Sequence, residues 1–333
     1  MNMVHGDHTL LHCRPLLRQM ISKLSNLSFS SLPLPPAQLT NLESLGYLEM
    51  TAIQAAALPQ ALAGVDLIGQ AKTGSGKTAA FTLPLLTRIN PRDFGTQALI
   101  LCPTRELASQ VASEIRRLAR YQQNIKVVTL VGGQSIGPQI GSLEHGAHVV
   151  VGTPGRIKDH LRKETLSLER VNTLVLDEAD RMLEMGFVDD IEAIIGETPA
   201  TRQTLLFSAT FPENILKLSA RFQTTPQRVS VESLHDGQHL DQQFFICQKS
   251  DRLAALVKLL AHFQPSAAVV FCNTKQLVRE VCEHLNRSVI HAQALHGDME
   301  QRDRDQVLIQ FKHLSCSILV ATDVAARGLD IDD

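Results

Sequence analysis

Tryptophan is absent from this chain of 333 residues and tyrosine occurs only twice, so that aromatic residues make up 4% of the sequence. Aromatic rings are the platforms on which RRM and OB domains stack unpaired bases. The twelve phenylalanines are therefore little material for such a platform. Any nucleic acid bound here must be held mainly through its backbone.

Paired cysteines and long apolar runs are missing as well. No two cysteines form a Cys-x-x-Cys pair; the six are Cys13, Cys102, Cys247, Cys272, Cys282 and Cys316. This spacing disfavours both a zinc cluster and a disulfide framework and favours a reducing compartment. No apolar run reaches the roughly 18 residues that a membrane span needs. We therefore expect a soluble, cytoplasmic protein without a membrane partner.

Neither sign of charge is in excess. The chain has 32 Lys and Arg against 34 Asp and Glu, a formal net charge of −2, with 44% hydrophobic and 20% charged residues. This is the composition of an ordinary globular protein and excludes collagen-like and broadly disordered chains. At roughly 100 to 200 residues per domain, the length predicts two domains.

The N-terminal segment has a composition of its own. Residues 8–42 contain no acidic side chain but several Arg, Lys and Ser, a pattern that faintly resembles an organelle transit peptide. Pro15 and the prolines at 33, 35 and 36 disfavour one long amphipathic helix. We interpret residues 1–28 as a poorly ordered leader, with targeting as the alternative.

Short apolar runs alternate with helical patterns after this leader. The runs cover residues 66–71, 98–102, 126–131, 148–152, 173–176 and 204–207, and helical spacing is clearest at 106–120. Strands that are apolar on both faces indicate a parallel sheet covered by helices on both sides. The alternation pauses at a polar stretch, 233–240, and resumes with strands at 243–247, 267–271, 289–295 and 317–321. The pattern predicts two α/β domains, 29–232 and 241–333, joined by a linker at 233–240.

A glycine-containing loop follows the first predicted strand. It reads Ala71, Lys72, Thr73, Gly74, Ser75, Gly76, Lys77 and Thr78, which matches the phosphate-binding loop except for Ala71 at its first glycine. Backbone N–H groups and the start of a helix can surround phosphates, while Lys77 supplies a fixed charge and the Thr78 hydroxyl can ligate Mg²⁺. The alternative is a βα turn that carries Lys and Thr by chance.

Acidic residues follow another buried strand, one hundred residues after Lys77. Asp177 and Glu178 come directly after the run at 173–176, with Asp180 close behind. Such residues reach the carboxyl edge of a sheet, where ligands of open α/β sheets bind. Together with the loop, they predict that Asp177 holds Mg²⁺ and that Glu178 orients or deprotonates an attacking water. Taken alone, the cluster would more often be a solvated loop.

The run Asp177-Glu178-Ala179-Asp180 resembles the signature of the DEAD-box ATP-dependent RNA helicases. Other motifs of that family follow in order, with wording most similar to the DbpA-like bacterial subgroup. They are Gly46-Tyr47 and Thr51 to Gln54 (Q motif), Pro103 to Ala108 (Ia), Gly132-Gly133, Thr153 to Arg156 (Ib), Ser208 to Thr210 (III), Val270 to Thr274 (IV), Gln301 with Arg304, and Ala321 through Asp330 (V). The resemblance implies two RecA-like domains, the second incomplete.

On the nucleotide side, the resemblance implies that Gln54 reads the adenine edge beside Tyr47, and that Phe29, seventeen residues before Gly46, stacks on the base. A core position is the alternative for Phe29. Asp330 would contact the ATP ribose. Lys77, Asp177 and Glu178 are the implied catalytic residues, and ATP and Mg²⁺ the implied cofactors.

On the RNA side, the resemblance implies backbone contacts from two groups of residues. They are Thr104, Arg105, Gly133, Thr153 and Arg156 in the first domain and Arg304 and Thr322 in the second. Arg105 could instead pair with Glu106 or Asp180, and Arg304 and Asp330 could be solvated charges. The hydroxyls of Ser208 and Thr210 are expected to hydrogen-bond Asp180 and to couple the metal site to domain closure.

Two departures from the family pattern stand out. Met50 replaces the usual proline of the Q motif, and the chain ends at Asp333 before a motif VI with its arginine fingers. We therefore expect a fragment. The resemblance implies a monomeric ATP-dependent RNA helicase acting on ribosomal RNA in large-subunit assembly. The alternative is a catalytically impaired chain that only binds nucleotide or RNA.

Overall fold

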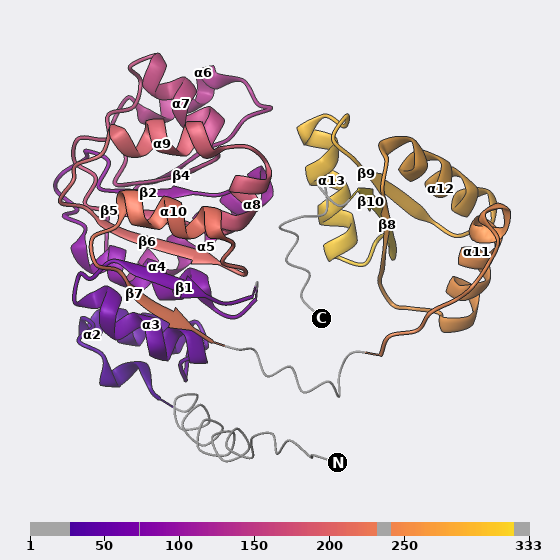
Figure 1. The fold of residues 1–333 in the computed structure, drawn as a ribbon, viewed down its shortest axis with the longest axis horizontal. Coiled ribbons are helices and arrows are strands. Elements are labelled where there is room, and N and C mark those ends of the chain that lie inside the picture. Colours follow the sequence, from indigo (N-terminus) through magenta and orange to yellow (C-terminus); the bar gives the residue numbers. More distant parts are fainter. Residues whose placement is uncertain (1–26, 73, 232–240, 323–333) are drawn as a thin grey trace, which may run out of the picture. The chain divides into compact units, whose positions relative to one another are not determined.

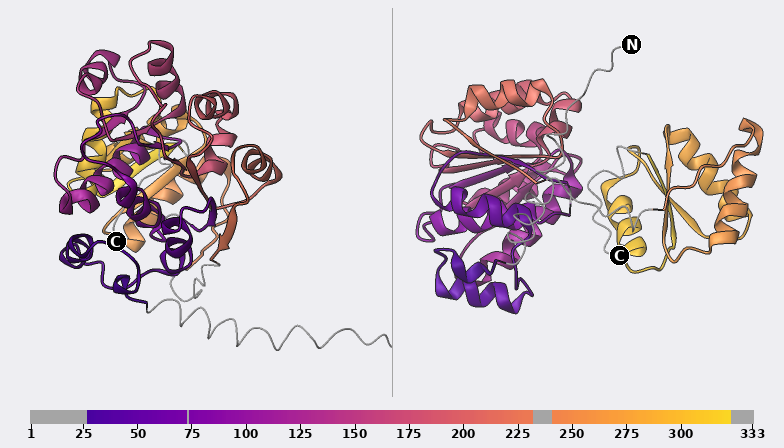
Figure 2. Two further views of the ribbon diagram at one scale, coloured as in Figure 1. Left: turned by 90° about the vertical axis from the view of Figure 1, so that its left-hand side faces the viewer. Right: turned by 60° about the horizontal axis from the view of Figure 1, so that its bottom comes forward.

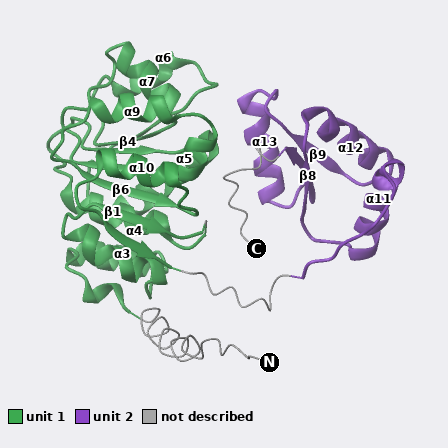
Figure 3. Ribbon diagram, in the orientation of Figure 1, with its two compact units in different colours: residues 1–233 green, residues 234–333 purple. Residues whose placement is uncertain are grey.

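The computed structural model describes residues 27–72, 74–231 and 241–322. The chain divides into two compact units, unit 1 over residues 1–233 and unit 2 over residues 234–333 (Figure 3). The predicted linker, 233–240, lies outside the described residues, as does most of the predicted leader. Each unit is therefore described by itself.

Unit 1 is built around one parallel sheet. Its described part contains seven strands in the order β3-β4-β2-β5-β6-β1-β7 (Figure 1). All six pairings are parallel. The strands are β1 (Leu67–Gln70), β2 (Ala98–Leu101), β3 (Val127–Leu130), β4 (Val149–Gly152), β5 (Thr173–Leu176), β6 (Gln203–Ser208) and β7 (Gln227–Ser230).

Helices cover both faces of this sheet (Figure 2). One layer contains α2 (Pro36–Ser44), α3 (Ala52–Leu62), α4 (Lys77–Arg88) and α5 (Arg105–Leu118). The other contains α6 (Ile136–Leu143), α7 (Pro154–Arg162), α8 (Ala179–Glu184), α9 (Val188–Gly196) and α10 (Glu213–Phe222). Because side chains alternate along a strand, Leu205 of β6 packs under the first layer and Leu206 under the second. Short 3₁₀ turns, η1 (Phe29–Ser31) and η2 (Ala119–Tyr121), complete the unit.

Helix α5 shows how the sequence pattern becomes structure. Thr104 caps its start, since its hydroxyl oxygen accepts the N–H of Leu107 at 3.2 Å. The apolar residues spaced at three and four, from Leu107 through Ile115 to Leu118, are all buried. The helix predicted over 106–120 is confirmed within one turn at its end.

Unit 2 repeats the arrangement on a smaller scale. Its described strands are β8 (Ala268–Cys272), β9 (Ala292–Leu295) and β10 (Ile318–Thr322), paired in parallel in the order β8-β10-β9. Its helices are α11 (Arg252–Phe263), α12 (Lys275–Arg287) and α13 (Gln301–Lys312), preceded by η3 (Lys249–Asp251). Helices α11 and α12 pack on one face of β10 and α13 on the other. The predicted fold class, two RecA-like parallel-sheet units, is confirmed.

One predicted strand was wrong, and one observed strand was not predicted. Residues 243–247 form no strand, and Phe244 and Ile246 are exposed. An apolar run becomes a strand only when a neighbour supplies hydrogen bonds, and none of the described strands pairs with this segment. Conversely, β7 was not predicted, because it is an edge strand whose residues are largely exposed and mostly polar.

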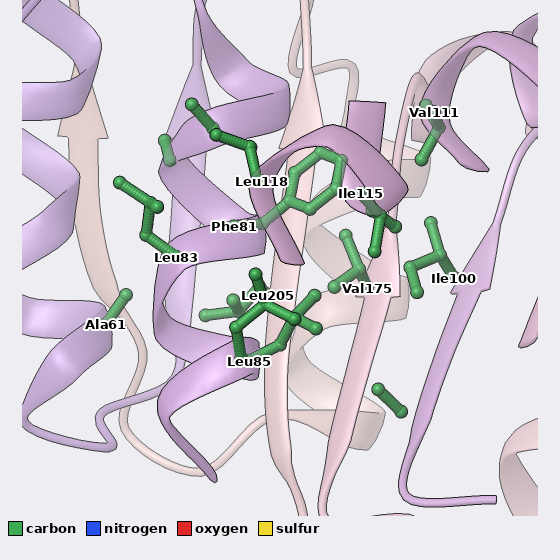
Figure 4. Close-up of a cluster of buried hydrophobic side chains, with 14 of the residues drawn as sticks. Ala61, Phe81, Leu83, Leu85, Ile100, Val111, Ile115, Leu118, Val175 and Leu205 are labelled. Carbon is green, nitrogen blue, oxygen red and sulfur yellow. The ribbon is translucent and has the colours of Figure 1, made fainter. Parts of the chain in front are cut away.

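The unit 1 core predicts a large loss of stability for Leu205→Ala. Leu205 is fully buried beside Phe81, Leu85 and Val175 (Figure 4). Removing its side chain loses apolar burial and leaves a cavity, which lowers the free energy of unfolding by about 2–5 kcal/mol. Urea unfolding measures this. Leu48→Ala, at a residue that is 69% exposed, is the control, with a change below about 0.5 kcal/mol. Equal losses in the two variants would contradict the assignment of the core.

Candidate functional site

The predicted site residues of unit 1 gather at one edge of its sheet. Because all paired strands are parallel, their carboxyl ends meet at that edge. The strand order then sorts the residues into two groups. The loop at 71–78, the acidic run from Asp177 and the Ser208 triplet follow β1, β5 and β6, which are neighbours. Thr104, Gly133 and Thr153 follow β2, β3 and β4, which are also neighbours.

The glycine loop is shaped by what packs behind it. Gly76 has φ +91° and precedes the first residue of α4. A Cβ there would lie 2.5 Å from Gln54 Nε2 and 2.9 Å from Thr51 Oγ1, so that no other residue fits. The loop starts at Ala71, whose N–H donates to the Ser208 carbonyl at 3.1 Å. Thr73 lies outside the described residues.

The ammonium group of Lys77, near the end of the glycine loop, is available to bind a ligand. Lys77 is 6% exposed, and its Nζ has no hydrogen-bond partner among the described residues. Leaving a buried ammonium unpaired is unfavourable, so the position fits an anionic ligand such as a phosphate. Thr78 is half-buried in the first turn of α4, while Lys72 is exposed and its carbonyl accepts the Ser75 hydroxyl at 2.6 Å.

Gln54 links the start of α3 to the glycine loop. Its Oε1 accepts the N–H of Thr51 at 2.9 Å, and its Nε2 donates to the Gly76 carbonyl at 3.1 Å. Thr51 and Gln54 thus form a capping box, a device readable from the spacing Thr-x-x-Gln that the sequence analysis overlooked. Pairing with adenine through both amide atoms would use Oε1 and Nε2 of Gln54, the same atoms that bind the Thr51 N–H and the Gly76 carbonyl. That role of Gln54 stays a prediction.

Phe29 and Tyr47 form an aromatic pair with unequal exposure. Phe29 is 3% exposed and meets the Tyr47 ring edge-on, with 6.1 Å between centroids. So little exposed surface leaves no ring face for a base, which favours the core alternative over the predicted stacking. Tyr47 is half-buried, and its hydroxyl donates to Glu114 Oε1 at 2.5 Å. Burial, followed by that hydrogen bond, raises the pKa of Tyr47 well above its usual value.

The acidic run is buried at the end of β5. Asp177 is 3% exposed and Glu178 4%. Glu178 has φ +52°, a conformation that costs energy for a residue with a side chain and is typical of functional positions. Its Oε2 lies 3.6 Å from Arg181 Nε. Burial, with a smaller contribution from the Glu178 carboxylate, raises the pKa of Asp177 to about 6, although the Lys77 charge opposes the shift.

A magnesium ion fits these carboxylates in one particular way. The described residues contain no group of three or more His, Cys, Asp or Glu side chains able to enclose a metal. Mg²⁺ commonly takes one or two protein carboxylates and completes its shell with substrate phosphates and water. Asp177 and the Thr78 hydroxyl suit that mode, in which the nucleotide brings the remaining oxygens.

Asp180 joins the acidic run to the end of β6. Thr210 donates to Asp180 Oδ2 from its N–H at 2.9 Å and from its hydroxyl at 2.8 Å. The Asp180 N–H donates to Ser208 Oγ at 3.2 Å. Burial alone would raise the pKa of Asp180, but the hydrogen bonds from Thr210 and Ser208 outweigh it and lower the pKa below its usual value. The structure therefore brings together the three residues that the sequence predicts to interact.

The second group of residues lies at the ends of β2, β3 and β4. The Arg105 guanidinium lies against Gly133, where a Cβ would be 1.6 Å from Nη1. Gly133 also has φ +69°, a conformation that favours glycine, and a side chain there would displace the Arg105 guanidinium. Thr153 is 8% exposed and is the N-cap residue that precedes α7. Arg156 donates to the Gln134 carbonyl at 2.8 Å, while its Nε and Nη1 have no hydrogen-bond partner among the described residues.

Unit 2 presents its predicted residues at the corresponding edge of its own sheet. Arg304 is in the first turn of α13 and donates to the His296 carbonyl at 3.4 Å, and Thr322 ends β10. Asp330 lies outside the described residues. A cluster that the sequence analysis missed precedes Arg304 in the chain, since Lys275 and Arg279 both pair with Asp298.

A parallel α/β unit with this phosphate-type loop and acidic edge, followed by a second parallel unit, defines an ATPase of the helicase class. The profile described as DEAD/DEAH box helicase matches residues 51–218, and the one described as Helicase conserved C-terminal domain matches 251–333. The chain belongs to the DEAD-box ATP-dependent RNA helicase family, whose members are ATP-hydrolysing enzymes.

Two relatives illustrate the likeness. ATP-dependent RNA helicase DbpA of Escherichia coli (strain K12) is 57% identical, over 91% of this chain and 67% of the relative. DEAD-box ATP-dependent RNA helicase CshA of Bacillus cereus is 46% identical, over 91% of this chain and 58% of the relative. The chain thus spans less than two thirds of the length of CshA.

Solved structures of other proteins are also similar to this chain. A DEAD box protein from Methanococcus jannaschii matches with a TM-score of 0.60 and 38% identity, covering 93% of this chain and 84% of that one. Saccharomyces cerevisiae Dbp5 bound to RNA and ADP BeF3 matches with a TM-score of 0.83 and 29% identity, covering 91% and 78%. None of the helices within the described ranges has the length and apolarity to cross a membrane.

The raised pKa of Asp177 predicts a pH effect on stability. The folded chain binds this proton more tightly than the unfolded chain does, so stability falls as pH rises from about 4 to about 6. The rise of the pKa of Asp177 from its usual value to about 6 corresponds to about 3 kcal/mol. Asp177→Asn removes the effect, so its stability relative to wild type increases by about that amount across this pH range. Urea unfolding at a series of pH values measures it, with the exposed Asp189→Asn as control. A pH-independent difference would refute the burial of an ionisable Asp177.

Proposed function

We propose that this protein is an ATP-dependent RNA helicase that binds ATP with Mg²⁺ and RNA at two halves of one sheet edge. The observation that carries the proposal is the sorting of residues by strand order. Loops after β1, β6 and β5 supply an unpartnered buried lysine and buried carboxylates, as phosphate and metal require. Loops after β2, β4 and β3 supply arginines, hydroxyls and a glycine, as a sequence-independent grip on RNA backbone requires.

In the nucleotide half, Lys77 and the N–H groups of the loop bind the phosphates, and Tyr47 lies against the base. Thr78 and Asp177 hold Mg²⁺, which when bound neutralises charge on the phosphates. Glu178 orients the attacking water and accepts its proton. The Glu178 carboxylate is held by the backbone at the end of β5, beside the Arg181 guanidinium, so it is aimed before substrate arrives.

Asp180, Ser208 and Thr210 couple the two roles of the edge. Ser208 connects the glycine loop to the acidic run, since its carbonyl accepts the N–H of Ala71 and its hydroxyl accepts the N–H of Asp180. A shift of the acidic run on RNA binding would reach the glycine loop through this residue. Binding of ATP and RNA would then favour closure of the two units, and hydrolysis would release the RNA.

The proposal predicts that Glu178→Gln loses RNA-stimulated ATP hydrolysis while keeping ATP affinity. The amide retains the shape of the side chain but cannot accept a proton, which removes on the order of 10²- to 10⁴-fold in turnover. Steady-state hydrolysis and nucleotide titration measure the two effects. The exposed Glu197→Gln is the matched control and keeps full activity. Turnover that survives Glu178→Gln would sink the assignment.

The finer proposal is that the RNA is ribosomal and that the protein is a cytoplasmic monomer in large-subunit assembly. The likeness to the DbpA-like subgroup supports ribosomal RNA as the substrate. The contacts proposed above do not, because contacts to the RNA backbone do not distinguish one RNA sequence from another. We expect large-subunit ribosomal RNA to stimulate ATP hydrolysis at lower concentration than an unrelated RNA of equal length. Titrations of both RNAs against the same preparation measure this. Equal stimulation would reject the ribosomal assignment and leave RNA binding intact.

A further inference from the structure

We propose that Gln139 and His160 are positioning residues that hold the loop Val131 to Gln134 in its RNA-binding conformation. The inference rests on the proposed function, because that loop contains Gly133 and lies beside Arg105 and Arg156. Neither Gln139 nor His160 belongs to the residues proposed to contact RNA. Both are nearly inaccessible, at 7% and 0% exposure.

A continuous chain of hydrogen bonds connects His160 to the loop. Gln139 Nε2, in the first turn of α6, donates to the Val131 carbonyl at 2.9 Å. Gln139 Oε1 lies 3.4 Å from His160 Nε2 in α7. His160 Nδ1 lies 2.8 Å from the Thr165 hydroxyl. The end of β3 is thus connected to the end of α7 through two buried side chains.

The chemistry of the groups sets the direction of the two bonds that Gln139 makes. The Val131 carbonyl can only accept, so Gln139 must present its NH₂ there and its oxygen to His160. His160 Nε2 therefore carries the proton, and Nδ1 is left as an acceptor beside the Thr165 hydroxyl, which also reaches the His160 carbonyl at 3.2 Å. The imidazole is neutral, in keeping with burial and the nearby Arg156 charge, which lower its pKa. A network in which each donor meets an acceptor is rigid and specifies one arrangement.

Holding the Val131 carbonyl also aims the next N–H group. A trans peptide unit is planar, so the N–H of Gly132 points opposite to the carbonyl of Val131. With that carbonyl turned towards Gln139, the Gly132 N–H is directed away from α6. Arg156 fixes the other end of the loop through the Gln134 carbonyl. The two glycines are therefore held between two anchored carbonyls.

His148 offers a matched comparison. It is also 0% exposed and directly precedes β4, the strand that pairs with β3. Its Nδ1 accepts the N–H of Lys126 at 3.0 Å, and its Nε2 lies 3.2 Å from the Pro91 carbonyl. Lys126 precedes β3, so His148 supports the start of that strand, at the edge opposite the site. A purely structural role for buried histidines would make His148 and His160 equivalent.

The test compares Gln139→Met, His160→Leu and their double variant with His148→Leu. We expect the first two to raise the KM for RNA in ATP hydrolysis on the order of tenfold, as expected for one lost buried hydrogen bond. The KM for ATP and the kcat at saturating RNA stay unchanged. Because both residues act through one chain, the double variant is no worse than the more affected single variant. His148→Leu lowers the Tm comparably and leaves the KM for RNA unchanged.

Amide hydrogen exchange separates this inference from the proposed function, because it needs no RNA. Exchange at Gly132 and Gly133 should be faster in Gln139→Met and unchanged in His148→Leu. Unchanged exchange in Gln139→Met, or an equal rise of the KM for RNA in His148→Leu, would overturn the positioning role. A wild-type chain whose ATP hydrolysis does not respond to RNA would overturn the proposed function, while the exchange result would still decide the positioning of the loop.

Discussion

Parallel pairing of β5, β6 and β1 is the constraint on which the rest of unit 1 depends. It sets the residues after these three strands side by side at one edge, although the loop after β1 lies more than one hundred residues before the other two in the chain. The price is that the strands must be apolar on both faces and covered by two layers of helices. Polar side chains are therefore concentrated where the strands end. The position of the site follows from the covering of both sheet faces by helices.

Within that edge, the buried residues Ser208 and Gln54 connect the segments of the site. Ser208 joins the glycine loop and the acidic run with two of its atoms, and Gln54 joins α3 to the same loop with its amide. These links consist of short side chains in buried surroundings, where a hydrogen bond is stronger and a lost one is more harmful than in water. Small displacements at one end of such a chain therefore reach the other.

The sequence predicted the central strands of unit 1 well because their apolar runs have one explanation, burial on both faces. It failed where the same signal is ambiguous. Residues 243–247 are apolar but have no described strand partner, while β7 is polar because it lies at an edge. Site residues could be predicted by type and order, and so could the hydrogen bonds of Asp180 with Ser208 and Thr210, but other contacts could not. The burial of Phe29 beneath Tyr47 and the contact of Arg105 with Gly133 depend on packing between distant segments.

The crowding behind Gly76 has a consequence for how such a protein can change. The space that a methyl group would need is already filled by Gln54 and Thr51. A variant that enlarges the loop must displace the amide proposed to read the base, and a variant that reshapes the base pocket must move the loop. With Gln54 and the loop in their proposed roles, nucleotide selectivity and phosphate affinity depend on the same contact, so a change in one requires compensating changes in the other.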